Sequence, residues 1–152
     1  MIIIGYQGIG KSTLAGINRF IDLESGNFWV DGKREDNWYK IYCNIANHLS
    51  HQGYNVFVSS HEVVRKELAN SNETVIIICP SLELEDEWIE KLKTRWEYSK
   101  LDKDYKAYMN ASDRYKENIL ELINDNNFLT LIIDHMDYNL EDLISKYNII
   151  AI

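Results

Sequence analysis

The residues with the clearest chemistry stand near the start of the chain, in the run Gly5-Tyr6-Gln7-Gly8-Ile9-Gly10-Lys11-Ser12. This run matches the pattern G-x-x-x-x-G-K-[ST] at every defined position. It follows a short apolar run and precedes a segment, 12–17, that can form a helix. Glycines let backbone N–H groups turn towards phosphate oxygens, and a helix start favours negative charge. The spacing therefore predicts a binding loop for a nucleoside triphosphate.

Each chemical group of this loop has an expected role. Lys11 is expected to contact the β- and γ-phosphates, and the hydroxyl of Ser12 to hold the Mg²⁺ that bridges them and neutralises their charge. ATP and Mg²⁺ are therefore the expected cofactors. The residues expected to bind the nucleotide are Gly5, Gly8, Ile9, Gly10, Lys11, Ser12 and Thr13.

Two carboxylates, Asp22 and Glu24, follow a second apolar run at 19–23. Side chains two residues apart on an extended strand point to the same side of the chain. The carboxyl ends of the strands are where open α/β sheets bind ligands. Asp22 is therefore a candidate for Mg²⁺ or acceptor binding, with Glu24 beside it; a solvated strand end is the alternative for both.

Aromatic and cationic residues alternate in the next segment, which contains Phe28, Trp29, Lys33, Arg34 and Trp38. A nucleobase can stack on such rings while a cation meets its phosphate. Aromatics that belong to the core, beside solvated cations, are an equally good reading. The segment therefore indicates an acceptor region without selecting one residue in it.

The elements that must position these groups follow from hydrophobic periodicity. Continuous apolar runs predict five strands that are buried on both faces, at 1–4, 19–23, 54–59, 74–79 and 128–134. Helical apolar stripes lie between and after them, for example Trp38, Ile41, Tyr42, Ile45 and Leu49. Alternating elements of this kind indicate an α/β fold, a parallel sheet covered by helices on both faces. Residues 149–152 are open between a sixth strand and a docked tail.

Composition limits the partners. The 152 residues suit one domain, 1–152, since domains commonly have about 100–150 residues. Sixteen Lys and Arg against twenty-four Asp and Glu give a net charge of −8, which disfavours long nucleic acid as a partner. No apolar run is long enough to span a membrane, and we expect a cytoplasmic protein with Cys43 and Cys79 as buried, reduced thiols. His48 and His51 have no further metal ligand at a suitable spacing, so no structural metal is expected.

An early phosphate loop, five strands alternating with helices, and an Arg after the third strand resemble the small P-loop kinases. That superfamily contains adenylate kinase and the other nucleoside monophosphate kinases and, more remotely, shikimate and gluconate kinases. The resemblance implies a P-loop NTPase fold with the strand order 2-3-1-4-5. It also implies an acceptor-binding insertion at about 25–53 and a mobile lid at about 81–108.

The resemblance also implies roles for single residues. Arg65 is similar in position to the Arg that binds the acceptor phosphate, and Lys91 and Arg95 to lid cations that reach over the triphosphate. The expected catalytic residues are therefore Lys11, Asp22, Arg65 and Arg95, with Ser12 and Asp22 at the metal. Asp134 ends an apolar run and has two readings, a Mg²⁺-associated carboxylate or the start of a loop, 135–139, that lines the adenine pocket; Asn139 is expected to cap the following helix.

Together these features predict Mg²⁺- and ATP-dependent phosphoryl transfer to a small acceptor, a nucleoside or deoxynucleoside monophosphate. One alternative is a shikimate-like, gluconate-like or nucleoside kinase that acts on a hydroxyl, which the acidic pair would suit. Another is a regulatory module that binds ATP without transferring phosphate, since the loop alone fixes nucleotide binding and not its use. The oligomeric state is open.

Overall fold

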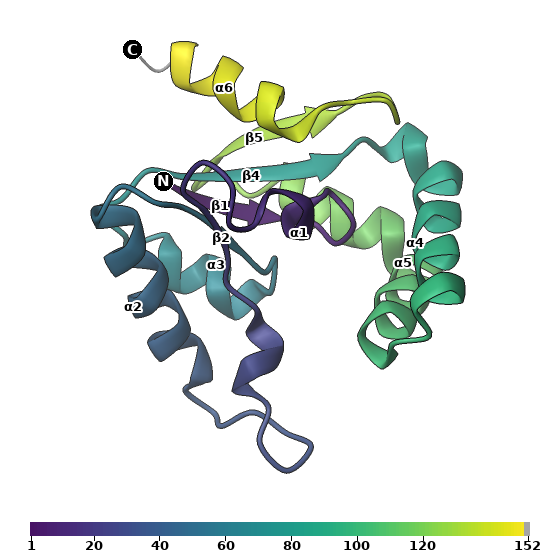
Figure 1. The fold of residues 1–152 in the computed structure, drawn as a ribbon, viewed down its shortest axis with the longest axis horizontal. Helices are drawn as coiled ribbons and strands as arrows, with labels where there is room; N and C mark the ends of the chain where they lie inside the picture. Colours follow the sequence, from purple (N-terminus) through teal and green to yellow (C-terminus); the bar gives the residue numbers. More distant parts are fainter. Residues whose placement is uncertain (151–152) are drawn as a thin grey trace.

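The computed structural model describes residues 1–150 and contains one five-stranded sheet with helices on both faces (Figure 1). All neighbouring strands are parallel, and their order is β2-β3-β1-β4-β5. The α/β class, the five strands and the strand order are therefore confirmed. The strands are β1 (Ile2–Gly5), β2 (Phe20–Asp22), β3 (Asn55–Val58), β4 (Val75–Pro80) and β5 (Leu129–Ile133).

Six helices and two 3₁₀ turns connect and cover these strands. They are α1 (Lys11–Leu14), η1 (Ser25–Phe28), α2 (Trp38–His51), α3 (Glu62–Leu68), η2 (Leu82–Leu84), α4 (Glu85–Ser99), α5 (Asp102–Ile123) and α6 (Leu140–Ile150). None of the described helices is long and apolar enough to cross a membrane. Because α6 includes residues 149 and 150, no sixth strand begins there; residues 151 and 152 lie outside the described part of the chain.

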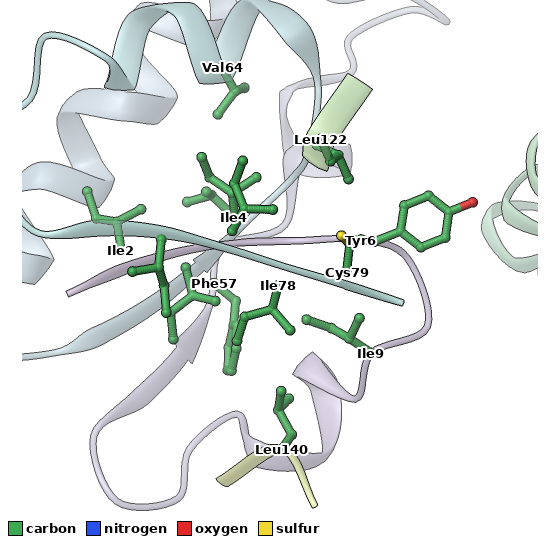
Figure 2. Packing of buried hydrophobic residues seen from close by; sticks show 14 of the residues in the cluster. Ile2, Ile4, Tyr6, Ile9, Phe57, Val64, Ile78, Cys79, Leu122 and Leu140 are labelled. Carbon is green, nitrogen blue, oxygen red and sulfur yellow. The ribbon is translucent and has the colours of Figure 1, made fainter. Parts of the chain in front are cut away.

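The central strands are apolar because helices cover both of their faces. The side chains of β1 and most of those of β4 are fully buried. Figure 2 shows Val64 of α3 and Leu122 of α5 on one side of the strands and Leu140 of α6 on the other. The edge strand β5 differs from the prediction, because Leu129 and Ile132 are about half exposed.

Helix α2 buries a face that is rotated from the predicted stripe. Its buried side chains include Tyr42, Cys43 and Ala46, whereas Ile41 and Ile45 are exposed. The hydroxyl of Tyr42 donates a hydrogen bond to the carbonyl oxygen of Leu23, at 2.6 Å, and accepts one from the N–H of Ser59. This phenol thereby joins the ends of β2 and β3, and it turns the helix face that carries it inward.

Helix α1 is shorter than the segment 12–17 predicted for it. It ends at Leu14, and the chain then turns through Gly16, Asn18 and Arg19, which all have positive φ. The N–H of Gly16 donates to the carbonyl oxygen of Phe20 and closes this turn at 2.8 Å. The phosphate loop is therefore followed by one helical turn and then directly by β2.

Helices α4 and α5 pack side by side as a hairpin (Figure 1). Helix α5 has a kink at Arg114, whose φ of −138° and ψ of 22° are not helical. Just beyond the kink, the Tyr115 hydroxyl donates to the carbonyl oxygen of Ser81 at 2.8 Å. The predicted lid region, 81–108, thus consists of η2, α4 and the first turns of α5, and the predicted insertion, 25–53, of η1, a loop and α2.

Both cysteines are buried free thiols, as predicted. Cys43 lies on α2 with its Sγ 3.8 Å from the carbonyl oxygen of Val64, and Cys79 lies in β4. Burial raises the pKa of each thiol to about 12. At neutral pH both are therefore uncharged core side chains.

Candidate active site

The phosphate loop connects β1 to α1 at the carboxyl edge of the sheet. Two of its positions require glycine. Gly8 and Gly10 have φ values of 86° and 109°, which L side chains rarely adopt. A Cβ on Gly8 would also lie 2.9 Å from Cδ2 of Leu92. The loop can therefore pass closely under α4 only with glycine at position 8.

The loop is held from outside by two aromatic side chains. Nε1 of Trp88 donates to the carbonyl oxygen of Gln7 at 2.9 Å, and the hydroxyl of Tyr138 donates to that of Ile9 at 2.6 Å. The N–H groups of Gly8, Ile9 and Gly10 have no acceptor within residues 1–150. Two carbonyl oxygens of the loop are thus hydrogen-bonded to the protein, while a row of N–H donors is left for an anionic ligand.

Lys11 and Asp22 form the charged centre of the site. Nζ of Lys11 lies 3.4 Å from the carbonyl oxygen of Gly5. Burial lowers the pKa of Lys11, and Asp22 and Glu24 oppose that shift. Burial likewise raises the pKa of Asp22, against the effect of Lys11. The two side chains therefore lie in one another's field, and the acidic residue that ends β2 meets the lysine of the loop.

Ser12 and Asp22 fit a magnesium ion. Both line the same cleft, and they supply the oxygen donors that Mg²⁺ prefers. Within residues 1–150 there is no group of three or more His, Cys, Asp and Glu side chains suited to a metal ion. An ion held here would therefore take most of its ligands from phosphate oxygens and water, as Mg²⁺ usually does in nucleotide sites.

The cleft has a volume of about 770 Å³ and extends well beyond the loop. One wall is formed by the end of β2, by η1, and by the residues that follow β3, 59–62 together with Arg65. The opposite wall is formed by α5. At its mouth, Nζ of Lys103 lies 3.9 Å from Glu24, and Nζ of Lys106 lies 5.5 Å from the ring centre of Trp29. These contacts join the two walls across the cleft.

Arg34 lies on the wall opposite α5, between two indole rings. Its guanidinium carbon is 5.0 Å from the ring centre of Trp29 and 4.4 Å from that of Trp38. Its Nε and one terminal nitrogen donate to the carbonyl oxygen and hydroxyl of Ser25, at 3.3 and 3.2 Å. It has no carboxylate partner among the described residues, unlike the other arginines of the cleft. The cation is fixed in position and its charge is not neutralised.

The remaining aromatic residues of this segment have different surroundings. Phe28 packs against Trp38 and Tyr42 at the edge of the core, so it does not offer a free ring. Trp29 is about half exposed and lines the cleft. Lys33 lies outside the cleft and pairs its backbone with Val30. Of the predicted stacking residues, Trp29 is the one at the cleft surface.

Arg65 has partners that the sequence reasoning did not predict. Its side chain is 7% exposed, and its guanidinium donates to Glu121 at 2.6 Å and to Asp125 at 2.7 Å. Its Nε donates to the carbonyl oxygen of Ser60. Although Arg65 lines the cleft, it is already neutralised by two carboxylates, Glu121 of the last turn of α5 and Asp125 just after it. These contacts join α3 to α5.

His61 lies beside Arg34 and Lys11 at the start of α3. Its Nδ1 is 2.8 Å from the hydroxyl oxygen of Ser59, and its ring contacts Trp38 edge to face. Partial burial, together with the positive charges of Arg34 and Lys11, lowers the pKa of His61 to about 4. The ring is therefore neutral at pH 7.

The two predicted lid cations separate. Arg95 lines the cleft, where its Nε lies 3.0 Å from the buried carboxylate of Asp104. Lys91 instead donates to the Tyr138 hydroxyl at 3.1 Å and lies over the ring of Trp88 at 4.4 Å, outside the cleft. The arrangement brings Arg95 to the phosphate loop and leaves Lys91 behind that loop.

The residues after β5 also have their own contacts. Asp134 is exposed and pairs with His135, and neither Asp134 nor any residue of the loop 135–139 lines the cleft. The predicted cap is confirmed, since the side-chain oxygen of Asn139 accepts a hydrogen bond from the N–H of Asp142 at 2.9 Å. His51 lies 3.3 Å from Glu73 at the far surface.

One polar face of the cleft was not predicted from the sequence. Among the polar α5 residues that line the cleft, four follow one another at spacings of three, four and four: Lys103, Lys106, Asn110 and Arg114. Such spacing places them on one side of a helix. The signal was present in the sequence, next to the apolar stripe that continues through Tyr115 and Ile119. A polar stripe is also what a solvated helix face looks like, so spacing alone could not select it.

In sequence comparisons, no family model and no curated protein matches the chain.

Proposed function

We propose that the protein is a P-loop enzyme that binds ATP with Mg²⁺ and transfers the terminal phosphoryl group to a nucleoside or deoxynucleoside monophosphate. The observation that carries the proposal is the braced loop. Its N–H groups at Gly8, Ile9 and Gly10 lack acceptors within residues 1–150, and they lie beside Lys11 at the carboxyl edge of a parallel sheet. Open donors, a lysine and a helix start together suit a triphosphate.

Lys11 and the residues around it would each contact a different part of the bound ATP and Mg²⁺. Lys11 and the loop N–H groups would hold the β- and γ-phosphates, and Ser12 and Asp22 would orient the metal. When bound, Mg²⁺ neutralises charge that builds up on the transferred group. Arg95, released from Asp104, would bind the same phosphates from the α4 side. Such a reaction belongs in the cytoplasm, where ATP is present and free thiols stay reduced.

The charges of the cleft support an acceptor that carries a phosphate. Seven cations line it, and five of these are paired with carboxylates within the described residues: Arg65, Arg95, Lys103, Lys106 and Arg114. Lys11 and Arg34 are the two that have no such partner. With Lys11 on the donor phosphates, Arg34 is the cation that can bind an acceptor phosphate without first breaking an ion pair. Trp29, next to it, offers a ring to a nucleobase.

Asp22 favours a second candidate, transfer to a hydroxyl group. Burial raises the pKa of this carboxyl group, which makes it a better base, and it lies next to Glu24 where a phosphate would be repelled. A nucleoside or polyol acceptor would suit that environment. The two candidates differ in the charge of the acceptor, which makes them easy to separate.

An acceptor panel tests the proposal. Purified protein is incubated with ATP and Mg²⁺ and with nucleoside monophosphates, deoxynucleoside monophosphates, nucleosides, shikimate or gluconate, and ADP formation is followed. We expect Mg²⁺-dependent turnover with one or more monophosphates, well above the rate without acceptor. Turnover confined to the hydroxyl compounds would support the second candidate. ATP binding without any acceptor-dependent turnover would indicate a regulatory module, and absence of ATP binding would refute the assignment of the loop.

A further inference from the structure

The side chains of Tyr6 and Gln7 both extend from the loop to α5; the ring of Tyr6 packs edge to face against Tyr115, and Gln7 makes hydrogen bonds. Nε2 of Gln7 lies 3.0 Å from the carbonyl oxygen of Ala107 and 3.2 Å from Oδ1 of Asn110, both on α5 and about 100 positions along the chain. The same nitrogen also lies 3.4 Å from the hydroxyl oxygen of Tyr6, and the two contacts to α5 are the shorter ones, one for each N–H group of the amide. The backbone carbonyl oxygen of Gln7 accepts the indole N–H of Trp88. One residue of the phosphate loop is thus hydrogen-bonded to both helices of the α4–α5 hairpin.

The point of attachment lies in the middle of the polar face of α5. Ala107 and Asn110 stand between Lys106 and Arg114, which line the cleft on either side of them. The carboxylate pairs of these two cations, with Asp102 and Glu117, are exposed, and exposed pairs contribute little energy. Both cations are therefore free to exchange a carboxylate for a phosphate, provided that the helix is correctly placed.

The contact also continues past the kink of α5. Oδ1 of Asn110 accepts a second hydrogen bond, from Nδ2 of Asn118 at 2.9 Å, and Arg114 with its non-helical backbone lies between these two asparagines. The chain of amides from Gln7 to Asn118 therefore spans the place where the helix bends. A change at the loop would reach the helix on both sides of the bend.

We infer that Gln7 is a positioning residue, which fixes α5 relative to the phosphate loop so that Lys106 and Arg114 face the nucleotide phosphates. This inference rests on the proposed function, since it presupposes a nucleotide on the loop. Gln7 acts through α5 and need not touch the reacting atoms. The fold does not depend on its amide, because Ala107 and Asn110 lie in the regular helical part of α5 before the kink, Tyr6 packs against Tyr115, and the loop carbonyl is held by Trp88.

The test compares Gln7→Met with the wild type. Methionine has a similar length and no N–H group to donate. We expect the variant to bind ATP with a Kd within about threefold of the wild type, and its kcat to fall about tenfold, the value of one or two hydrogen bonds. Asn110→Ala should give a similar loss, and the double variant no greater loss than either single one, because both substitutions break the same link.

Hydrogen exchange provides the readout that a merely structural role would not change. A non-hydrolysable ATP analogue with Mg²⁺ should slow amide exchange over residues 102–114 in the wild type and leave it unchanged in Gln7→Met. The control is Gln52→Met, since Gln52 is the other glutamine of the chain and is exposed after α2. Should Gln7→Met misfold, Asn110→Ala takes its place in both measurements.

The outcomes separate this inference from the function on which it rests. If the wild type does not bind the analogue, the proposed function fails and this inference fails with it. If the analogue binds and protects 102–114 equally in wild type and variant, or if the two substitutions multiply their effects on kcat, Gln7 does not position α5 and the nucleotide site stands.

Discussion

The two ends of the cleft are built in different ways. The end proposed for the nucleotide donor is a run of consecutive residues, 5–12, whose backbone N–H groups would form the binding surface. The end proposed for the acceptor is assembled from side chains that come from η1, the loop before α2 and the start of α3. A surface made of neighbouring residues can be recognised from sequence. A surface made of distant ones depends on which charges meet after folding.

Two arginines of the acceptor end show the same contrast on a smaller scale. Arg65 is buried and paired with two carboxylates, whereas Arg34 is held by aromatic rings and neutral oxygens. The first arrangement stabilises the fold, and the second leaves a cation available to a ligand. Substitutions at the donor end, at Arg65 and at Arg34 should therefore change three different properties, which are turnover, stability and acceptor binding.

The largest effect is expected at the donor end. Lys11→Ala should lower acceptor-dependent ADP formation about 10²–10³-fold, because the cation on the phosphates is lost. The far-ultraviolet circular dichroism spectrum should stay unchanged. Lys116→Ala, an exposed lysine of α5 outside the cleft, is the matched control. If Lys11→Ala keeps the wild-type turnover, Lys11 does not act on the donor phosphates and the loop is not the donor end of the cleft.

Arg65→Ala should act on stability. We expect the free energy of unfolding in urea to fall by about 3 kcal/mol, since nearly buried Asp125 would lose its cation. Burial opposes the charge of Asp125, but hydrogen bonds from Arg65 and Asn127 lower its pKa below 3.8. The stabilisation from this carboxylate is therefore present above about pH 4 and lost as the pH falls further. Lys66→Ala, whose pair with Glu62 is exposed, should cost under about 1 kcal/mol. If Arg65→Ala keeps the wild-type free energy of unfolding and raises the acceptor KM, Arg65 binds the acceptor phosphate instead.

Asp22→Asn should act on turnover. We expect kcat to fall about 10²-fold while the Kd of ATP changes little, because the carboxylate would orient the metal or the acceptor and leave the phosphate contacts intact. Asp113→Asn, on the exposed side of α5, serves as the control. Equal turnover in Asp22→Asn and wild type would mean that Asp22 is a solvated strand end.

Arg34→Gln should act on acceptor binding. An acceptor KM raised about tenfold with kcat nearly unchanged is the result expected for a contact made equally in the ground and transition states. Lys33→Gln, its neighbour outside the cleft, should leave both constants unchanged. If a monophosphate is the acceptor and Arg34→Gln keeps the wild-type KM for it, Arg34 does not bind the acceptor phosphate.

The smallest effect is a shift in one titration. In a nuclear magnetic resonance titration His61 should have a pKa of about 4, since partial burial and the charges of Arg34 and Lys11 all disfavour its protonation. Removing one of these charges in Arg34→Gln should move that pKa upwards, towards the value near 6.5 of a free histidine. An unaltered His61 titration in the variant would show that the two side chains are not neighbours in solution.

The sequence was sufficient for the α/β fold, the strand order and the place of the glycine-rich loop after β1, because hydrophobic period and loop spacing are local properties. It was insufficient for Arg65, whose partners Glu121 and Asp125 lie 56 and 60 positions away. It also failed to separate Lys91 from Arg95, because a shared helix face does not determine where two long side chains end. The supports of the loop, Trp88 and Tyr138, read as ordinary apolar positions, since only the folded chain brings their donors to the loop carbonyls.

The buried thiols have a practical consequence. Because Cys43 and Cys79 are about 1% and 0% exposed and ionise only near pH 12, an alkylating reagent can modify them only when the core opens. The rate of modification therefore measures how often the core opens, at Cys43 on α2 and at Cys79 in β4. A ligand that binds only the folded chain lowers the rate at which both thiols are modified, and the rate falls further as a larger fraction of the protein is bound. Thiol labelling can thereby rank nucleotides by affinity before any reaction has been found.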